Sequence, residues 1–228
     1  MSYEEEATNN KGPEAHFWSR LAKMLVFAGV FLVGFSVVLF LLIFYPVLKE
    51  EIRYKVSDKP TDVVISMDDG EHKKGEDHMN PVDTDFGIVV PKINANAKVI
   101  ENVDPYNSWE YQQSLTQGVA HAKGSSVPGE DGNVFIFAHS SDNFYNANRY
   151  NSVFYLLNKL EISDYFYLIK DSVIYKYAVE QTGVVKPENV EYLSPNYGER
   201  TAVLMTCWPP GTTIDRLIVV GKLDSITK

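Results

Sequence analysis

The longest feature in the hydrophobic pattern of this chain is a run from Met24 to Leu48 that contains no charged residue. An apolar stretch of about 20 residues is long enough for a helix to span a lipid bilayer. The run is apolar on every face of a helix, which is typical of a membrane span and not of a core helix. It ends at Phe44-Tyr45-Pro46 and not in the small residues of a signal-peptide cleavage site. We predict a transmembrane helix over residues 24–48.

Polar segments flank this run on both sides. Residues 1–23 predict a short tail without a core of its own. Residues 49–85 are acidic and contain Gly and Pro, and they predict a flexible polar spacer. Within that spacer, His72, Asp77 and His78 match no metal-ligand spacing, so we predict no metal site.

From residue 86 onward, short runs of apolar and β-branched residues alternate with turn-forming residues. Strands are predicted at residues 86–90, 98–101, 118–121, 134–138, 164–170, 173–181, 203–205 and 217–220. Short helices are predicted at 108–115, with Ser108 as the N-cap, and at 151–157. About eight short strands with brief helical insertions favour an all-β closed barrel over a doubly wound sheet, so we assign residues 86–228 to one barrel domain.

Charge and cysteine content exclude several classes of function. The 228-residue chain has a formal net charge of −9, so nucleic acid is not an expected partner. It contains a single cysteine, which excludes an internal disulfide framework and a four-cysteine zinc site.

That cysteine, Cys207, closes one predicted strand, and Arg216 opens the next strand after a Pro-Pro-Gly turn. If the two strands pair, a thiol and a permanent cation meet at one rim of the sheet, and a nearby cation favours the nucleophilic thiolate. His139 follows the apolar strand 134–138, and His121 follows another short strand. A cysteine nucleophile needs a base and donors for its oxyanion, so these residue types indicate acyl transfer through a thioester. The residues alone do not choose between His139 and His121 as the base.

The order of these motifs resembles that of the bacterial sortases, which are membrane-anchored cysteine transpeptidases. The family signature, Thr-Leu-x-Thr-Cys followed by an arginine on the next strand, stands here as Val203-Leu204-Met205-Thr206-Cys207 with Arg216 after it. The first threonine of the signature is replaced by Val203. A turn-rich segment beginning at Val127 leads into the strand that ends Phe137-Ala138-His139-Ser140, like the histidine strand of the family. The segments Phe86–Ile93 and Val119–His121 also fit the family order.

This resemblance implies an eight-stranded sortase-like barrel and a mechanism. Cys207 is expected to attack a sorting-signal peptide, usually Leu-Pro-x-Thr-Gly-like, between Thr and Gly, and to form a thioacyl-enzyme. An amine of a peptidoglycan cross-bridge or a pilin lysine then resolves it. The family order selects His139 as the acid and base, and Arg216 is expected to hold the substrate backbone or the oxyanion.

The same resemblance suggests that Leu204, Thr206 and Trp208 lie against the substrate. We expect no cofactor and no metal site from the sequence. The resemblance also places the catalytic domain on the extracellular face of the membrane, because sorting substrates are met after export. The cations that flank the apolar run, such as Arg20 and Lys49, do not settle the orientation on their own.

Two other functions stay open at this point. The first is an envelope cysteine hydrolase, because hydrolysis and transfer share the acyl-enzyme and differ only in the final acceptor. The second is an envelope adaptor that keeps the barrel without catalysis. A peptidoglycan L,D-transpeptidase is disfavoured, because the Ser-His-Gly run that precedes the cysteine in those enzymes is absent here.

Overall fold

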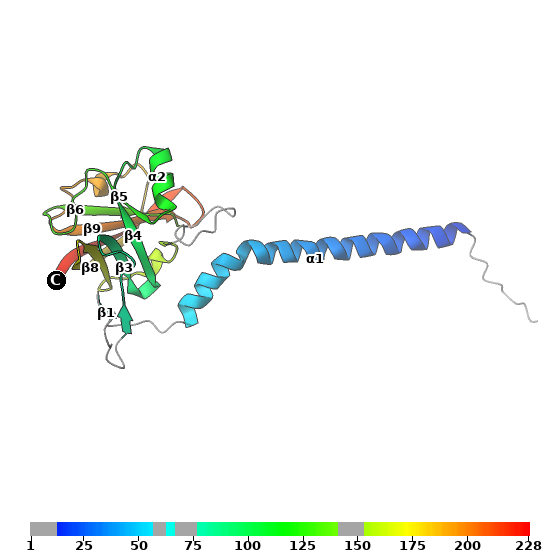
Figure 1. Ribbon diagram of the computed structural model, residues 1–228. Helices are drawn as coiled ribbons and strands as arrows, with labels where there is room; N and C mark the ends of the chain where they lie inside the picture. Colours follow the sequence, from blue (N-terminus) through cyan, green and yellow to red (C-terminus); the bar gives the residue numbers. More distant parts are fainter. Residues whose placement is uncertain (1–12, 57–62, 67–76, 141–152) are drawn as a thin grey trace, which may run out of the picture. The chain divides into compact units, whose positions relative to one another are not determined.

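The computed structural model of this protein describes residues 13–56, 63–66, 77–140 and 153–228. The chain divides into two compact units, Met1–Ser57 and Asp58–Lys228. The first unit contains the long helix α1, and the second contains a β-barrel with the short segments that cover it (Figure 1).

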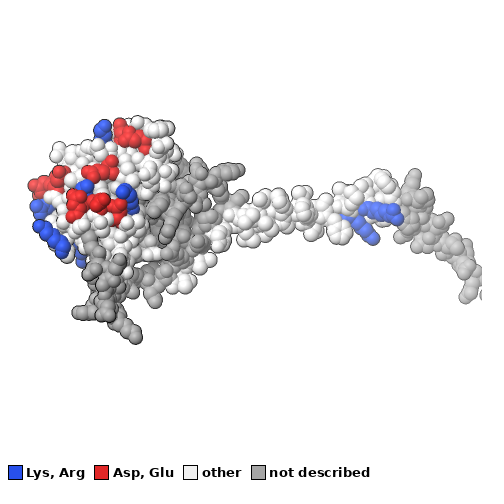
Figure 2. Space-filling model, in the orientation of Figure 1, with Lys and Arg blue, Asp and Glu red and all other residues white. Residues whose placement is uncertain are grey.

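Helix α1 (Pro13–Val56) contains the apolar run. Its segment Phe17–Leu42, 26 residues long, has a mean hydropathy of 2.9 and is not buried against protein. Such a helix is about 39 Å long, which exceeds the hydrocarbon core of a bilayer. Figure 2 shows no charged side chain on its middle part, while Arg20 and Lys23 lie near one end. By length and composition α1 could therefore span a membrane. The helix itself extends past the predicted span of 24–48 at both ends.

Eight strands of the second unit close into a barrel in the order β10-β8-β7-β3-β4-β5-β6-β9. The strands are β3 (Phe86–Val90), β4 (Ala95–Val103), β5 (Val119–Ala122), β6 (Asn133–Phe137), β7 (Tyr165–Lys170), β8 (Val173–Val185), β9 (Thr201–Trp208) and β10 (Asp215–Thr227). A barrel of this size is just wide enough for side chains to fill, and Ile88, Ile136 and Leu204 have no accessible surface. The predicted all-β closed barrel is confirmed.

Two of the strand pairs in the barrel are parallel, and one of them builds the candidate site. β4 pairs with β5 and β6 pairs with β9 in parallel, whereas the other neighbours are antiparallel. Parallel neighbours bring their carboxyl ends to the same rim. Because β10 begins where β9 ends, the ends of β6 and β9 and the start of β10 lie at one rim of the barrel.

The predicted hairpin around Asp171-Ser172 is present between β7 and β8. Both turn residues have positive φ angles, 50° and 60°, as a two-residue type I′ turn requires. Strand β8 runs to Val185, four residues beyond the predicted end, because its second half pairs with β10. That pairing partner is the last strand of the domain, which begins 30 residues after β8 ends, so the local sequence does not predict the pairing.

The first predicted short helix is confirmed as α2 (Ser108–Leu115), which lies beside β4 and β5 (Figure 1). Its N-cap is Asn107 and not Ser108, because the Asn107 side chain accepts the hydrogen bond from Glu110 N. The prediction of a helix over 151–157 was wrong in its described part. Residues 153–156 form turns and a 3₁₀ helix follows at η2 (Leu157–Lys159); residues 151–152 lie outside the described residues. Two further 3₁₀ turns are η1 (Pro91–Ile93) and η3 (Glu191–Leu193).

Part of the segment predicted as a flexible spacer is folded onto the barrel. Strands β1 (Val63–Ile65) and β2 (Asp77–Met79) form a parallel pair. The side chains of Ile65 and Met79 pack against a buried cluster of barrel residues, namely Val89, Ile169 and Ile174. Ile65 and Met79, which flank a polar stretch of the sequence, thus cover this cluster on the barrel. Residues 57–62 and 67–76 of the predicted spacer lie outside the described residues.

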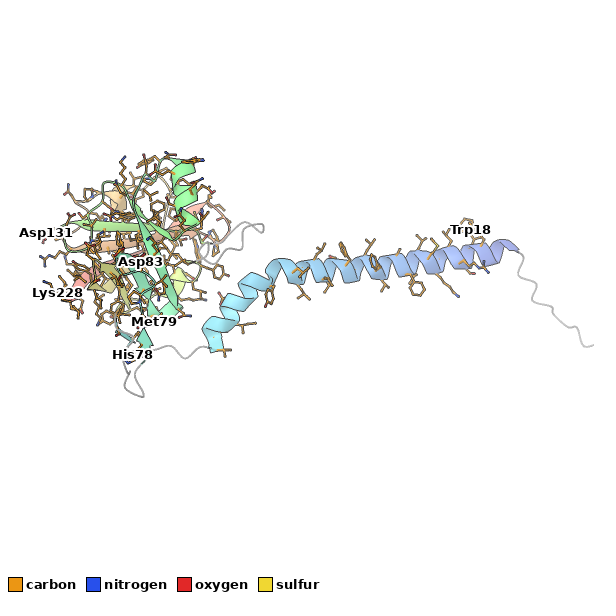
Figure 3. The ribbon with its side chains drawn as sticks, viewed as in Figure 1. Trp18, His78, Met79, Asp83, Asp131 and Lys228 are labelled. Carbon is orange, nitrogen blue, oxygen red and sulfur yellow. The ribbon has the colours of Figure 1, made fainter. Side chains whose placement is uncertain are left out.

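Asp83 fixes the entry from this segment into β3 (Figure 3). Its carboxylate accepts hydrogen bonds from the backbone N–H groups of Asp85 and Phe86, at 3.0 and 2.9 Å, and lies 3.0 Å from Lys98 Nζ. Although burial raises the pKa of Asp83, the hydrogen bonds from Phe86 and Lys98 hold it below its ordinary value. A Cβ at Gly87 would collide with the backbone oxygen of Asp83, so the close approach requires glycine there.

Candidate active site

Cys207 and Arg216 are directly paired residues of β9 and β10. Directly paired residues of antiparallel strands point their side chains to the same face, about 5 Å apart at Cβ. Both residues are half-buried. The strands therefore bring the single thiol of the chain and a permanent cation to one rim of the barrel.

His139 reaches the same rim through the parallel pair β6–β9. The register pairs Phe137 with Met205, and Ala138 N donates to Met205 O at 3.1 Å, one step beyond the end of β6. Continued by two residues on each strand from the pair Phe137–Met205, this register sets His139 beside Cys207. His139 is half-buried.

The residue before the cysteine faces away from solvent. Thr206 is 2% exposed, and its hydroxyl donates to Ala138 O at 2.9 Å. Leu204, two residues earlier, is fully buried in the barrel core. Neither side chain has free surface for a peptide, which differs from the sequence prediction that both contact substrate. The sequence prediction rested on the closeness of both residues to Cys207 in the chain. Side chains alternate between the two faces of a strand, however, and Leu204 and Thr206 point into the barrel.

Trp208 is the third predicted substrate contact, and it is half-buried at the end of β9. The turn that follows is held by Pro209 O, which accepts from both the N–H and the hydroxyl of Thr212, at 3.0 and 2.8 Å. Gly211 has a φ of 80°, and its N–H donates to Ser140 Oγ at 3.4 Å. The turn after Cys207 is thereby joined to the residue after His139.

The Arg216 guanidinium is oriented by its own turn. Nη1 donates to the backbone oxygens of Thr213 and Asp215, at 3.1 and 3.0 Å. The Asp215 carboxylate is engaged elsewhere, by Lys186 at 2.7 Å. A guanidinium carries five N–H donors in a fixed plane. Two backbone bonds to one nitrogen fix that plane and leave the other nitrogens to meet a carbonyl or an oxyanion.

His121, the rival base in the sequence, is a structural residue of the barrel. It is 2% exposed, and its Nδ1 accepts from Asn102 N at 3.2 Å, where β4 bulges. Its Nε2 lies 3.0 Å from Ser126 O and 2.8 Å from Ser125 Oγ. Because Nδ1 accepts, the proton of the neutral ring is on Nε2. Burial holds the pKa of His121 below its ordinary value of 6.5. A neutral, enclosed imidazole with both nitrogens engaged is not available to a substrate.

Within the described ranges of the chain, no group of three or more His, Cys, Asp or Glu side chains could hold a metal ion. Of the three spacer residues considered above for metal binding, Asp77 and His78 lie in β2, and His72 lies outside the described residues.

The rim therefore gathers a thiol, an imidazole and a guanidinium from three neighbouring strand ends. These are the groups that acyl transfer through a thioester requires: a nucleophile, a proton carrier and a donor for developing negative charge. Sequence reasoning did not single out Ser140, which joins the histidine segment to the turn after Cys207. Its position directly after His139 was the one signal available.

Comparison with known proteins finds matches over most of the barrel domain. A family model described as the Sortase domain matches residues 88–224, which is more than half of the 228-residue chain. Sortase D from Bacillus subtilis is 26% identical over 138 residues, covering 59% of this chain and 61% of that protein. The match thus spans less than two thirds of the length of that curated relative.

Solved structures give the same result for the fold. Sortase C-1 from Actinomyces oris is 29% identical, with a TM-score of 0.52 over 63% of this chain and 76% of that one. The pilus-related sortase C of Group B Streptococcus is 30% identical, with a TM-score of 0.52 over 63% of this chain and 69% of that one.

Proposed function

Because this chain belongs to the sortase family, we propose that it is a cysteine transpeptidase anchored to the membrane by α1. The observation that carries the proposal is the meeting of Cys207, Arg216 and the His139 segment at one rim of the barrel. A non-catalytic adaptor has no requirement for these three side chains at neighbouring strand ends.

In the first half-reaction, Cys207 Sγ attacks the carbonyl carbon of a sorting-signal peptide. The signal is Leu-Pro-x-Thr-Gly-like, and the attack falls between Thr and Gly. A C–S bond forms and gives a tetrahedral intermediate. When this intermediate collapses, the peptide C–N bond breaks, and His139 gives a proton to the leaving amine. The product is a thioacyl-enzyme with the acyl part of the substrate on Cys207.

In the second half-reaction, an amine attacks the thioester carbon. His139 takes the proton from the incoming nitrogen, the C–S bond breaks, and a new amide forms. The acceptor is an amine of a peptidoglycan cross-bridge or a pilin lysine. One of the similar structures is described as a pilus-related sortase, which supports a pilin among the acceptors of this chain.

Arg216 stabilises both tetrahedral intermediates in this scheme. Its Nη1 is fixed by Thr213 O and Asp215 O, so its remaining donors are held in one plane before substrate arrives. Preorganised donors act on developing charge without a reorganisation cost. The same donors can hold the substrate backbone in the ground state.

Trp208 is the substrate contact that we retain from the three predicted by sequence, because it is half-buried beside Cys207. We assign Leu204 to the core beneath the site and Thr206 to the support of the histidine segment, since both are buried. The catalytic domain lies on the extracellular face, where exported substrates and the cell wall are met.

The deciding experiment uses the full-length protein in detergent micelles with a fluorogenic sorting peptide. With an added amine such as oligoglycine, mass spectrometry is expected to find the transfer product. A hydrolase would give only the free acid with or without the amine. An adaptor would give neither product, and its other functions would survive Cys207→Ala. Cys207→Ala is expected to remove turnover while the circular dichroism spectrum of the barrel stays unchanged.

A further inference from the structure

We propose that Thr206 and Ser140 are positioning residues that hold the His139 imidazole toward Cys207. The inference rests on the proposed transpeptidase function and adds two residues to it. Thr206 bonds to Ala138, the residue before His139, and Ser140, the residue after His139, bonds to Gly211. Both bonds connect the histidine segment to the β9–β10 hairpin that carries the nucleophile. The histidine segment is thus fixed on both sides to the element whose thiol it serves.

The first tether is the hydroxyl of Thr206. A threonine that is 2% exposed in a strand of apolar neighbours must satisfy its hydroxyl, because an unpaired buried hydroxyl is costly. It does so by donating to Ala138 O at 2.9 Å. Together with the bond from Ala138 N to Met205 O, this gives Ala138 two links to β9 after β6 has ended.

The second tether runs from the turn after Cys207. Ser140 is 3% exposed, and its Oγ accepts from Gly211 N at 3.4 Å. The turn that presents this N–H is itself closed by the bonds from Thr212 to Pro209 O. The donor is therefore fixed in direction before it meets Ser140.

His139 is the single residue between the two tethered positions. The two hydrogen bonds therefore fix the position of the His139 Cα directly relative to β9 and the turn that follows it. A proton carrier must lie within about 3 Å of the group it serves, and a misplacement of about 1 Å can cost 100-fold in rate. Loss of either tether is expected to act through His139.

The chain offers a matched control at the other end of the same strand pair. Thr201 is also a buried threonine of β9, and its hydroxyl donates to Asn133 Oδ1 at the start of β6, at 3.0 Å. Thr201→Val and Thr206→Val remove the same group from the same strand, and each loses a buried hydrogen bond, to the first residue of β6 and to the residue directly after β6 respectively. Only the second bond lies next to His139.

The test measures amine transfer by the full-length protein in micelles. Thr206→Val is expected to lower kcat about 10- to 100-fold with little change in KM, and Ser140→Ala about 3- to 10-fold. Thr206→Ser keeps a hydroxyl and is expected to restore most of the rate. Thr201→Val is expected to lower the thermal midpoint and leave kcat within about threefold. Equal losses of kcat in both Thr→Val variants would overturn the proposal.

A double variant separates positioning from a direct role. If Thr206 acts through His139, adding Thr206→Val to His139→Ala is expected to cost no further rate. If the rate loss of the double variant equalled the product of the two single-variant losses, the proposal would be refuted.

A second readout does not need a sorting peptide. The rate of alkylation of Cys207, the single thiol of the chain, is followed from pH 5 to pH 9. The profiles of Thr206→Val and Ser140→Ala are expected to move toward that of His139→Ala, while Thr201→Val keeps the wild-type profile. If the wild type transferred no peptide to any amine, the proposed function would fail, and this profile would still decide whether the tethers position His139. A wild-type profile for Thr206→Val would contradict the tether.

Discussion

Cys207 and Arg216 stand opposite each other in the antiparallel register of β9 and β10, although eight residues, which include the Pro-Pro-Gly turn, separate them in the chain. Each neighbouring pair, from Asp215 with Trp208 to Lys222 with Thr201, keeps the same register without a bulge. The relative position of thiol and guanidinium is therefore set by backbone hydrogen bonds along the whole hairpin. A rigid ladder suits the proposed catalysis, in which a misplacement of about 1 Å can cost about 100-fold in rate.

Arg216→Lys is expected to lower kcat/KM for peptide transfer about 100-fold or more. Lysine keeps the charge but replaces a planar fork with a point charge, and it loses the two backbone bonds that orient the group. Steady-state kinetics with a fluorogenic peptide measure the effect. Arg200→Lys is the control, since it makes the same exchange at an exposed arginine outside the site, which pairs with Asp131. Wild-type rates in Arg216→Lys would show that only the charge matters.

His139→Ala is expected to lower kcat about 100- to 10,000-fold, the range that general acid–base catalysis contributes. His121→Ala is expected to leave kcat of the folded fraction within a few-fold of the wild type, because both ring nitrogens are engaged inside the barrel. The measurement is single-turnover kinetics after removal of unfolded protein. If His121→Ala were the inactive variant, the assignment of the base would be reversed.

His121 also predicts how stability depends on pH. Its pKa in the folded barrel is lowered from 6.5, mainly by burial, whereas the unfolded chain keeps the ordinary value. The unfolded state therefore binds a proton first as the pH falls. The free energy of unfolding is fully retained above pH 6.5, decreases as the pH falls below it, and levels off below the folded pKa.

Urea denaturation between pH 8 and pH 5, followed by near-ultraviolet circular dichroism, measures this effect. His121→Phe is expected to give a flatter profile across that range, with a lower stability at pH 8 because Asn102 N loses its acceptor. An unchanged slope in His121→Phe would show that another group causes the dependence.

Asp83→Ala is expected to lower the free energy of unfolding by about 1–3 kcal/mol. Two backbone N–H groups lose their acceptor, and Lys98 loses its partner. Asp85→Ala, at an exposed position two residues away, is expected to change it by less than about 0.5 kcal/mol. Urea denaturation at pH 7 compares the two. Similar values for both variants would mean that the entry segment adds little to the barrel.

The orientation of the chain can be read from labelling in intact cells. A membrane-impermeant maleimide is expected to label Cys207 without permeabilisation, because the catalytic domain is predicted outside. Since Cys207 is half-buried, a second variant places a cysteine at the exposed position Ile162, 68% exposed, in a Cys207→Ala background. Labelling of Ile162→Cys only after permeabilisation would place the domain inside.

The sequence alone determined the parts of this protein that depend on local pattern. A long charge-free run of apolar residues is unfavourable in water, so the apolar helix α1 could be predicted from composition. Short β-branched runs separated by turn residues gave the barrel, and the turn residues Asp171 and Ser172 gave one hairpin correctly. The order of the histidine strand, Cys207 and Arg216 along the chain indicated the family.

Tertiary structure decided what depends on residues that are distant in the chain. Whether His121 or His139 is enclosed depends on which loops pack over each ring. Whether Thr206 meets a peptide or a backbone carbonyl depends on the parallel register of β6 and β9, and the two strands are more than 60 residues apart. The segment around Met79 reads as polar spacer because its apolar partners lie in β3, β7 and β8. Local periodicity specifies which face a residue presents within its own strand, whereas the acceptor it finds there is supplied by another strand, and only the closed barrel brings the two together.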